Sequence, residues 1–196
     1  MFANRFTAFI DACTLVSALK RNLLLTLAEA EFFRVRWSDT VLDETERALV
    51  DIHSKRGLEN AVERAKRVRE AMEKAFEDAN VGKFDNLNLL CINLPDPDDD
   101  HVLAAAVKTR ADVIVTENLK DFPEKVLEPL MIESRSADAF IADTIALDPG
   151  RAVAAIRTMR MRLKNPAKTA EALLIDMESE GLVETVDVLR PHVASL

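Results

Sequence analysis

The residues best suited to chemistry in this sequence are acidic side chains that directly follow strand-like segments. Acidic or amide side chains follow three strand-like segments. Asp11 follows Phe6–Ile10, the acidic segment 96–100 follows Leu87–Leu94, and Asp112–Thr116 is followed by Glu117, Asn118 and Asp121. In a parallel α/β sheet, ligands bind beyond the carboxyl ends of the strands. We therefore expect these oxygens to converge in one cleft, joined by Glu44 if its predicted helix crosses that edge of the sheet.

Oxygen donors of this kind favour hard divalent cations. Mg²⁺ and Mn²⁺ prefer carboxylate and carbonyl oxygens, and Mg²⁺ keeps several waters while one or two carboxylates and a substrate phosphate complete its coordination. A cation held in this way can activate water and stabilise the leaving oxygen of a phosphodiester. The sequence shows no well-placed His, Cys or Ser dyad, so metal-assisted hydrolysis is the predicted chemistry.

The segment PDPDDDH, residues 95–101, allows two interpretations that can coexist. In the first it begins a helix, with Asp96 as N-cap, Pro97 at the first helical position, and Asp98 and Asp99 favoured by the helix dipole. In the second it binds a cation, because four acids within five residues repel one another and a divalent ion would offset that repulsion. His101 is expected to pack on the helix rather than to bind metal.

Composition limits the class of protein. The chain has 196 residues with a formal net charge of −8, and its two cysteines form no metal-binding spacing. No run is long and apolar enough for a membrane span, and we expect a cytoplasmic protein without a secretory leader. Cys13 and Cys91 are expected to be core residues in a reducing compartment.

Strand-like and helix-like segments alternate along the first part of the chain, which favours an α/β fold with a central parallel sheet. Helices are expected from Thr14 to Glu31, Ser38 to Ser54, Leu58 to Asn80, Asp96 to Thr109 and Ser136 to Leu147; a short strand is expected at Leu130–Glu133 and an extended connector at Phe32–Trp37. After Asp148 the pattern is helical only, with breaks at Asn165-Pro166 and Gly181. We therefore predict an α/β domain over residues 1–144 and a helical extension over 145–196.

The extension carries a basic strip in an otherwise acidic chain. Residues 151–170 contain six of the 26 basic residues and no acid, which leaves 20 basic residues against 34 acidic ones elsewhere. Arg157, Arg160 and Lys164 are spaced to share one helical face. The strip could contact RNA phosphates, or it could bind an acidic partner or the acidic body of its own fold.

Three segments together resemble the four motifs of PIN-domain nucleases. FIDACTLVSAL resembles the first motif, SDTVLDETERAL the second, and LPDPDDDHVLAAAVKTRADVIVTENLKDFP the third and fourth. The resemblance covers about residues 6–135. It implies a three-layer sandwich around a parallel sheet, with the helical extension added at the C-terminal end.

The resemblance also implies roles for individual residues. Asp11, Glu44, Asp99 and Asp121 would be catalytic and, with Asn118, would hold Mg²⁺ or Mn²⁺; Thr14, Thr116 and Asp98 would support them. Asn118 stands where many family members have an acid. A neutral amide binds metal more weakly, so Asp121 would carry more of that role.

Within the family, the chain is most similar to VapC-type toxins of toxin–antitoxin pairs, in the longer form with a helical C-terminal addition. This similarity implies a metal-dependent endoribonuclease that cleaves RNA, is inhibited by a cognate antitoxin protein, and forms a homodimer. The alternative is a catalytically weakened PIN-fold module that acts by RNA or protein binding. A phosphatase with a nucleophilic Asp11 would need a second Asp at position 13, where this chain has Cys13.

Overall fold

The computed structural model describes residues 6–82, 94–164 and 166–196. These residues form a four-stranded sheet in the order β2-β1-β3-β4, and each neighbouring pair is parallel. The strands are β1 (Thr7–Ile10), β2 (Arg34–Arg36), β3 (Val113–Val115) and β4 (Glu133–Arg135). The two central strands, β1 and β3, are buried throughout, which confirms the predicted α/β fold with a parallel sheet.

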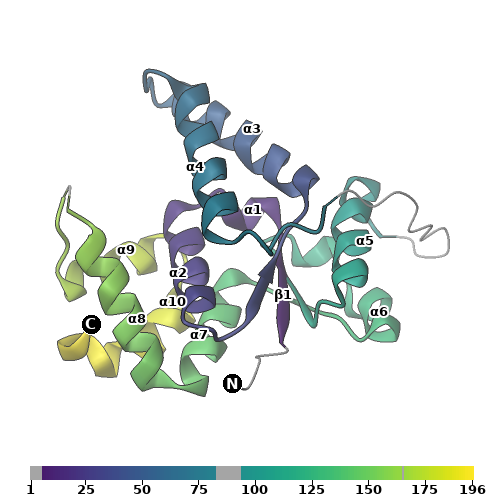
Figure 1. Ribbon diagram of the computed structural model, residues 1–196. Helices are drawn as coiled ribbons and strands as arrows, with labels where there is room; N and C mark the ends of the chain where they lie inside the picture. Colours follow the sequence, from purple (N-terminus) through teal and green to yellow (C-terminus); the bar gives the residue numbers. More distant parts are fainter. Residues whose placement is uncertain (1–5, 83–93, 165) are drawn as a thin grey trace.

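Helices surround this sheet, and a pair of long helices projects from it (Figure 1). α3 and α4 form the projecting pair, while α2 and α7 pack together near α8. The α-helices span Ala12–Leu15 (α1), Ala18–Glu29 (α2), Asp39–Lys55 (α3), Ala61–Ala75 (α4), Asp100–Thr109 (α5), Glu124–Leu127 (α6), Ala137–Leu147 (α7), Pro149–Arg162 (α8), Ala170–Ser179 (α9) and Val183–Leu189 (α10). Short 3-10 helices cover Pro97–Asp99, Leu119–Asp121, Glu128–Leu130 and Arg190–Ser195.

The helix predicted from Thr14 to Glu31 is divided in the structure into α1 and α2. Ser17 has an extended backbone and caps α2 by accepting a hydrogen bond from the backbone N–H of Lys20. The buried guanidinium of Arg21 donates to the carbonyls of Leu15 and Val16, which lie at the end of α1. Leucine spacing continues across the break, so hydrophobic periodicity alone could not reveal it.

Two strands differ from the sequence-based expectation. The expected connector at Phe32–Trp37 contains β2, which pairs with β1 and forms one edge of the sheet. The strand expected at Leu130–Glu133 was misplaced: β4 begins at Glu133, because Met131 has a left-handed backbone (φ 57°) that ends the preceding turn. The strand predicted at Leu87–Leu94 falls almost entirely outside the described residues.

The C-terminal helices pack onto the rest of the chain through a shared hydrophobic core. The helical pattern expected after Asp148 is confirmed: α8 begins at Pro149, and α9 follows the break at Asn165-Pro166 with Thr169 as its N-cap. Asp138, in the first turn of α7, accepts hydrogen bonds from the backbone N–H groups of Glu184 and Thr185 and so caps α10. A single cluster of buried hydrophobic side chains includes residues of β1 as well as Leu189 and Leu196. No helix among the described residues is long and apolar enough to cross a membrane.

Candidate metal-dependent nuclease site

Asp11 lies at the carboxyl end of β1 and is only 4% exposed. Its Oδ1 accepts a hydrogen bond from the N–H of Ala12 (2.6 Å), which makes it the N-cap of α1. Its Oδ2 accepts one from the Thr116 hydroxyl at the end of β3 (2.7 Å). A buried carboxylate needs such donors, and here they come from the start of α1 and from the residue that follows β3.

The two threonines predicted to support this site, Thr14 and Thr116, form hydrogen bonds at the ends of the same two strands. Thr14 is fully buried, and its hydroxyl donates to the carbonyl of Val115 (3.3 Å). Thr116 is also fully buried and accepts a hydrogen bond from the N–H of Asn118 (3.0 Å), which fixes the start of the following loop. Both therefore hold the end of β3 against Asp11.

Cys13 takes part in this network rather than packing only in the core. Its Sγ lies 3.0 Å from Asp11 Oδ2 and accepts from the N–H of Glu117 (3.3 Å). Burial and the charge of Asp11 raise the pKa of the Cys13 thiol to about 11. The thiol thus stays protonated and donates to the carboxylate.

Glu44 comes from the second turn of α3 and meets the start of α5. Its Oε1 lies 3.0 Å from Nε2 of His101, and both side chains are partly exposed. His101 is two residues beyond Asp99, so this contact joins the helix acid to the predicted third motif. The expectation that His101 only packs on its helix was incomplete.

The four predicted catalytic acids lie close enough together that their charges affect the pKa of Asp99. Its carboxyl has a pKa raised to about 6, first by burial and then by the negative charges of Asp11, Asp121, Asp96 and Glu44. Asp121 is 8% exposed and ends the 3-10 helix that follows β3. We refer to Asp11, Glu44, Asp99 and Asp121 as the acidic cluster; they come from four different elements.

Among the acids next to Asp99 in the sequence, Asp96 has a role in local structure. Asp96 accepts a hydrogen bond from the N–H of Asp98 (3.0 Å), with Pro97 at the first helical position, so the capping interpretation is confirmed for Asp96. The side chain of Asp98 is exposed. Asn118 is exposed as well and anchors the loop through its backbone.

The donor chemistry of the acidic cluster fits a hard divalent cation. Like charges crowd around Asp99, and a cation would relieve their repulsion. Within the described ranges, no three His, Cys, Asp or Glu side chains form a ready-made metal cage. Mg²⁺ does not require one, since it is commonly bound by one or two carboxylates, waters and substrate phosphate.

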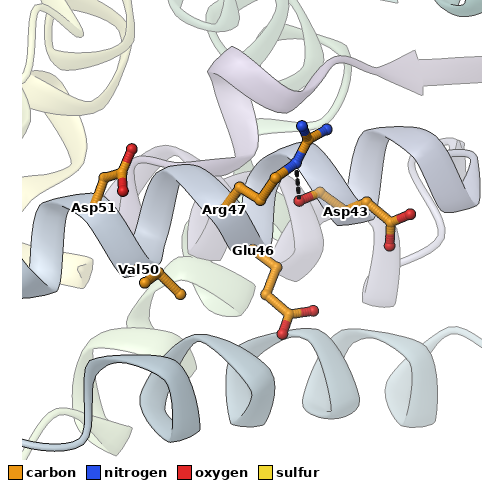
Figure 2. A pocket seen from close by; sticks show the side chains of 5 residues that line it. All are labelled: Asp43, Glu46, Arg47, Val50 and Asp51. Atoms are coloured by element: carbon orange, nitrogen blue, oxygen red, sulfur yellow. Dashed lines mark hydrogen bonds between the residues drawn. The ribbon is translucent and has the colours of Figure 1, made fainter.

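Asp43 and Glu46, which lie close to Glu44 in the sequence, contact α4 rather than the acidic cluster. Asp43 and Glu46 line an open surface hollow of about 600 Å³ with Arg47, Val50 and Asp51, and Glu46 is directed toward α4 (Figure 2). Arg69 of α4 donates to Asp43 and to Glu46 (3.3 Å). Glu44 is thus the acid of this helix that contacts the third motif, while its neighbours join α3 to α4.

Some side chains of the basic strip form hydrogen bonds or ion pairs within the protein. Arg160 donates to the carbonyl of Lys168 (2.6 Å), Arg162 pairs with Glu29 (3.3 Å), and Lys168 pairs with Asp176. Arg157 and Lys164 are exposed. Among the predicted RNA contacts, these two have their charged groups available at the surface.

Sequence reasoning missed the partners of the acidic cluster. His101 was visible only as a residue two positions after Asp99, and nothing in its spacing indicated that it would meet α3. Lys20 pairs with Glu117 (3.0 Å), the residue after Thr116, and Glu117 also accepts from the N–H of Ala137 at the start of α7 (3.3 Å). Glu44 and His101 are 57 positions apart in the sequence, and Lys20 and Glu117 are 97 apart, so no local pattern reveals these contacts.

Comparison with known proteins gives a family for each part of the chain. Residues 7–120 match the family model described as PIN domain, and residues 137–191 match VapC50 C-terminal domain. The chain is 43% identical over 76 residues to a protein of Mycobacterium tuberculosis named "Putative ribonuclease VapC50". That alignment covers 39% of this chain and 45% of the relative, so it spans less than half of that protein. No solved structure matches. The PIN-domain match covers more than half of the residues of this chain, so the chain belongs to the PIN-domain family, and its C-terminal part is similar to the VapC50 C-terminal domain.

Proposed function

We propose that this protein is a metal-dependent endoribonuclease that hydrolyses RNA phosphodiester bonds. The proposal rests on the close approach of negative charges around Asp99. The carboxylates of the other three residues of the acidic cluster contribute to the raised pKa of Asp99. Four acids brought together from separate elements repel one another, and a bound divalent cation would offset that repulsion. The similarity to a ribonuclease of the VapC type supports the same reaction.

The acidic cluster and Asn118 would hold Mg²⁺ or Mn²⁺. When bound, such a cation supplies an activated water and neutralises charge on the phosphate. Thr116, Cys13 and the N–H of Ala12 orient the Asp11 carboxylate through their hydrogen bonds. The residues of this chain therefore contribute a preorganised set of oxygens at the end of the sheet.

A cleavage assay with paired variants tests this proposal. Purified protein should cut RNA with Mg²⁺ or Mn²⁺ and stop when a chelator is added. Asp99→Asn should reduce the rate about 10²–10³-fold, the usual loss when a preorganised electrostatic contact at a developing charge is removed. Asp98→Asn is the matched control, because Asp98 is next to Asp99 in the sequence and its carboxylate is exposed. Equal rates for the two variants, or cleavage unaffected by chelator, would contradict the proposal.

The alternative is a PIN-fold module with weakened catalysis. It is supported by Asn118, a neutral side chain in a position where an acid would bind metal more strongly. If this alternative holds, Asn118→Asp should raise cleavage from a low level, whereas an already efficient nuclease should change little.

We further propose that the protein is the toxin of a toxin–antitoxin pair, acting in the cytoplasm as a homodimer under control of an antitoxin protein. The match to a VapC50 C-terminal domain supports this role. Expression of the chain alone should then arrest growth, and Asp99→Asn should abolish the arrest. Light scattering of the purified protein would test the dimer.

The basic strip supports a contact with RNA phosphates through Arg157 and Lys164. Changing both to Ala should weaken RNA binding and reduce the slope of log affinity against log salt by up to about two charge units. Arg162→Ala is a useful comparison, because that side chain pairs with Glu29. An unchanged salt slope would assign the strip to structure or to a protein partner.

A further inference from the structure

His101 and Glu44 form a polar contact between two helices at the edge of the acidic cluster. Nε2 of His101, in the first turn of α5, lies 3.0 Å from Oε1 of Glu44, in the second turn of α3. The side chains are 24% and 34% exposed, so neither is freely solvated. Glu44 is also one of the charges that act on Asp99.

The surroundings of His101 determine which nitrogen carries the proton. Nδ1 is buried and has no hydrogen-bond partner among the described residues. A proton on Nδ1 would therefore be an unpaired buried donor, while Nε2 would face the carboxylate with a lone pair. A proton on Nε2 avoids both problems, because Nε2–H then donates to Oε1 of Glu44.

A glutamate on a helix has three rotatable side-chain bonds, and it needs a partner to hold its carboxylate in one place. His101 can supply that restraint because it is two residues from Asp99 on a continuous helical segment. One hydrogen bond thus fixes the distance between the acid of α3 and the acid of the third motif. It uses Oε1 of Glu44 and leaves the second oxygen for another ligand.

We propose that His101 is a positioning residue, which holds Glu44 in the acidic cluster through an Nε2–H···Oε1 hydrogen bond. The inference rests on the proposed function, since it assigns Glu44 to cation binding. Partners that orient metal-binding side chains typically change metal affinity or activity by about 10–100-fold when they are removed. His101 would act only through Glu44.

Binding of Mn²⁺ alone, measured by calorimetry, tests this role without RNA. His101→Leu removes the donor and should weaken Mn²⁺ binding about 10–100-fold. His101→Gln places an amide N–H near the position of Nε2 and should restore most of the affinity. His53→Leu is the matched control, because His53 is also a partly buried histidine, on the same helix as Glu44, with an unpartnered Nδ1.

A double variant shows whether the effect passes through Glu44. On a Glu44→Gln background, His101→Leu should cause little further loss of Mn²⁺ affinity, because residues that act through one contact are not additive. Melting in chelator reports separately on folding, and if His101→Leu does not fold, the comparison of His101→Gln with His101→Asn replaces it. The Asn amide is too short to reach Glu44 and should not restore binding.

The outcomes separate this inference from the proposed function. Normal Mn²⁺ binding by wild type and by His101→Leu would overturn the positioning role alone, as would an undiminished loss on the Glu44→Gln background. Mn²⁺ binding with the expected pattern but no RNA cleavage would overturn the ribonuclease proposal and leave the role of His101 intact. A wild-type protein that binds no Mn²⁺ would overturn both.

Discussion

Among the individual residues, Thr116 has the closest side-chain contact with Asp11. Its hydroxyl is fully buried and donates to Oδ2 at 2.7 Å. Thr116→Val keeps the shape and leaves the carboxylate without this donor, so the free energy of unfolding should fall by about 1–3 kcal/mol and RNA cleavage should decrease.

Thr144→Val is the control for Thr116→Val. Thr144 is also buried, but its hydroxyl donates to the carbonyl of Phe140 within α7. Urea unfolding should show some loss for both variants, whereas only Thr116→Val should change cleavage. Unaltered cleavage by a folded Thr116→Val protein would mean that this hydrogen bond is structural only.

Asp99 makes the stability of the cation-free protein depend on pH. Burial and neighbouring carboxylates raise its pKa to about 6 from an ordinary value of 3.8. A proton on Asp99 therefore stabilises the folded chain, fully below about pH 4, and this contribution is lost as the pH rises through 6. In chelator, Asp99→Asn should thus gain unfolding free energy relative to wild type between pH 4.5 and 7.5.

Urea unfolding of both proteins across that range measures the difference directly. Titrating groups remote from Asp99 act equally on the two proteins and cancel, so the difference reports on Asp99 together with the carboxylates that act on it. Asp98→Asn should show no such trend, because its carboxylate is exposed. A difference between wild type and Asp99→Asn that stays constant with pH would contradict the crowding of charges around Asp99.

At the scale of elements, Arg69 joins α4 to α3, the helix that carries Glu44. It pairs with Asp43, with Glu46 (3.3 Å) and with Glu73 (3.1 Å), and its side chain is 23% exposed. These contacts raise the pKa of Arg69 further above its already high value, against the effect of burial. One cation thus neutralises several acids between the two helices.

Arg69→Met should lower the free energy of unfolding by about 1–2 kcal/mol, more than a single surface ion pair, because it leaves a set of like charges without a cation. The loss should depend on salt, which screens their repulsion. Arg67→Met is the control on the same helix, since Arg67 is 70% exposed and pairs only locally with Glu63. Equal losses for the two variants in low-salt urea unfolding would contradict this role of Arg69.

Elements were predictable from sequence where local chemistry determines them. The strand at Val113–Val115 is β-branched, Asp96-Pro97 begins a helical turn, and Asp148-Pro149 begins α8. The division between α1 and α2 depends on Arg21, and the start of β4 depends on the left-handed backbone of Met131. Neither feature has a periodic signal in the sequence.

The same distinction holds for the site. The positions of Asp11 and Asp121 follow from strand ends, and the four acids lie close together as expected. The contacts of His101 and Cys13 depend on how α3, α5 and the β3 loop pack. Such contacts can be read only from the assembled fold.

At the scale of the whole molecule, the sheet and the C-terminal helices form one packed body. Glu117 accepts from the first N–H of α7, Ser17 donates to Glu180 (3.0 Å), and Asp138 caps α10. In Figure 1 the extension, including α8, lies on the opposite side of the molecule from α5. The boundary between residues 144 and 145 stays a prediction.

The proposed nuclease activity depends on the acidic cluster binding a divalent cation, and thermal melting tests this binding most directly. Wild type, Asp99→Asn and Asp98→Asn are each melted with Mn²⁺ and with chelator. Wild type and Asp98→Asn should gain stability from Mn²⁺, by RT ln(1 + [L]/Kd), and Asp99→Asn should gain clearly less. In chelator, Asp99→Asn should melt at or above the temperature of wild type, because it relieves repulsion. Identical melts of wild type and Asp99→Asn with and without cation, together with RNA cleavage by Asp99→Asn, would contradict the account and leave Asp99 as part of a helix start.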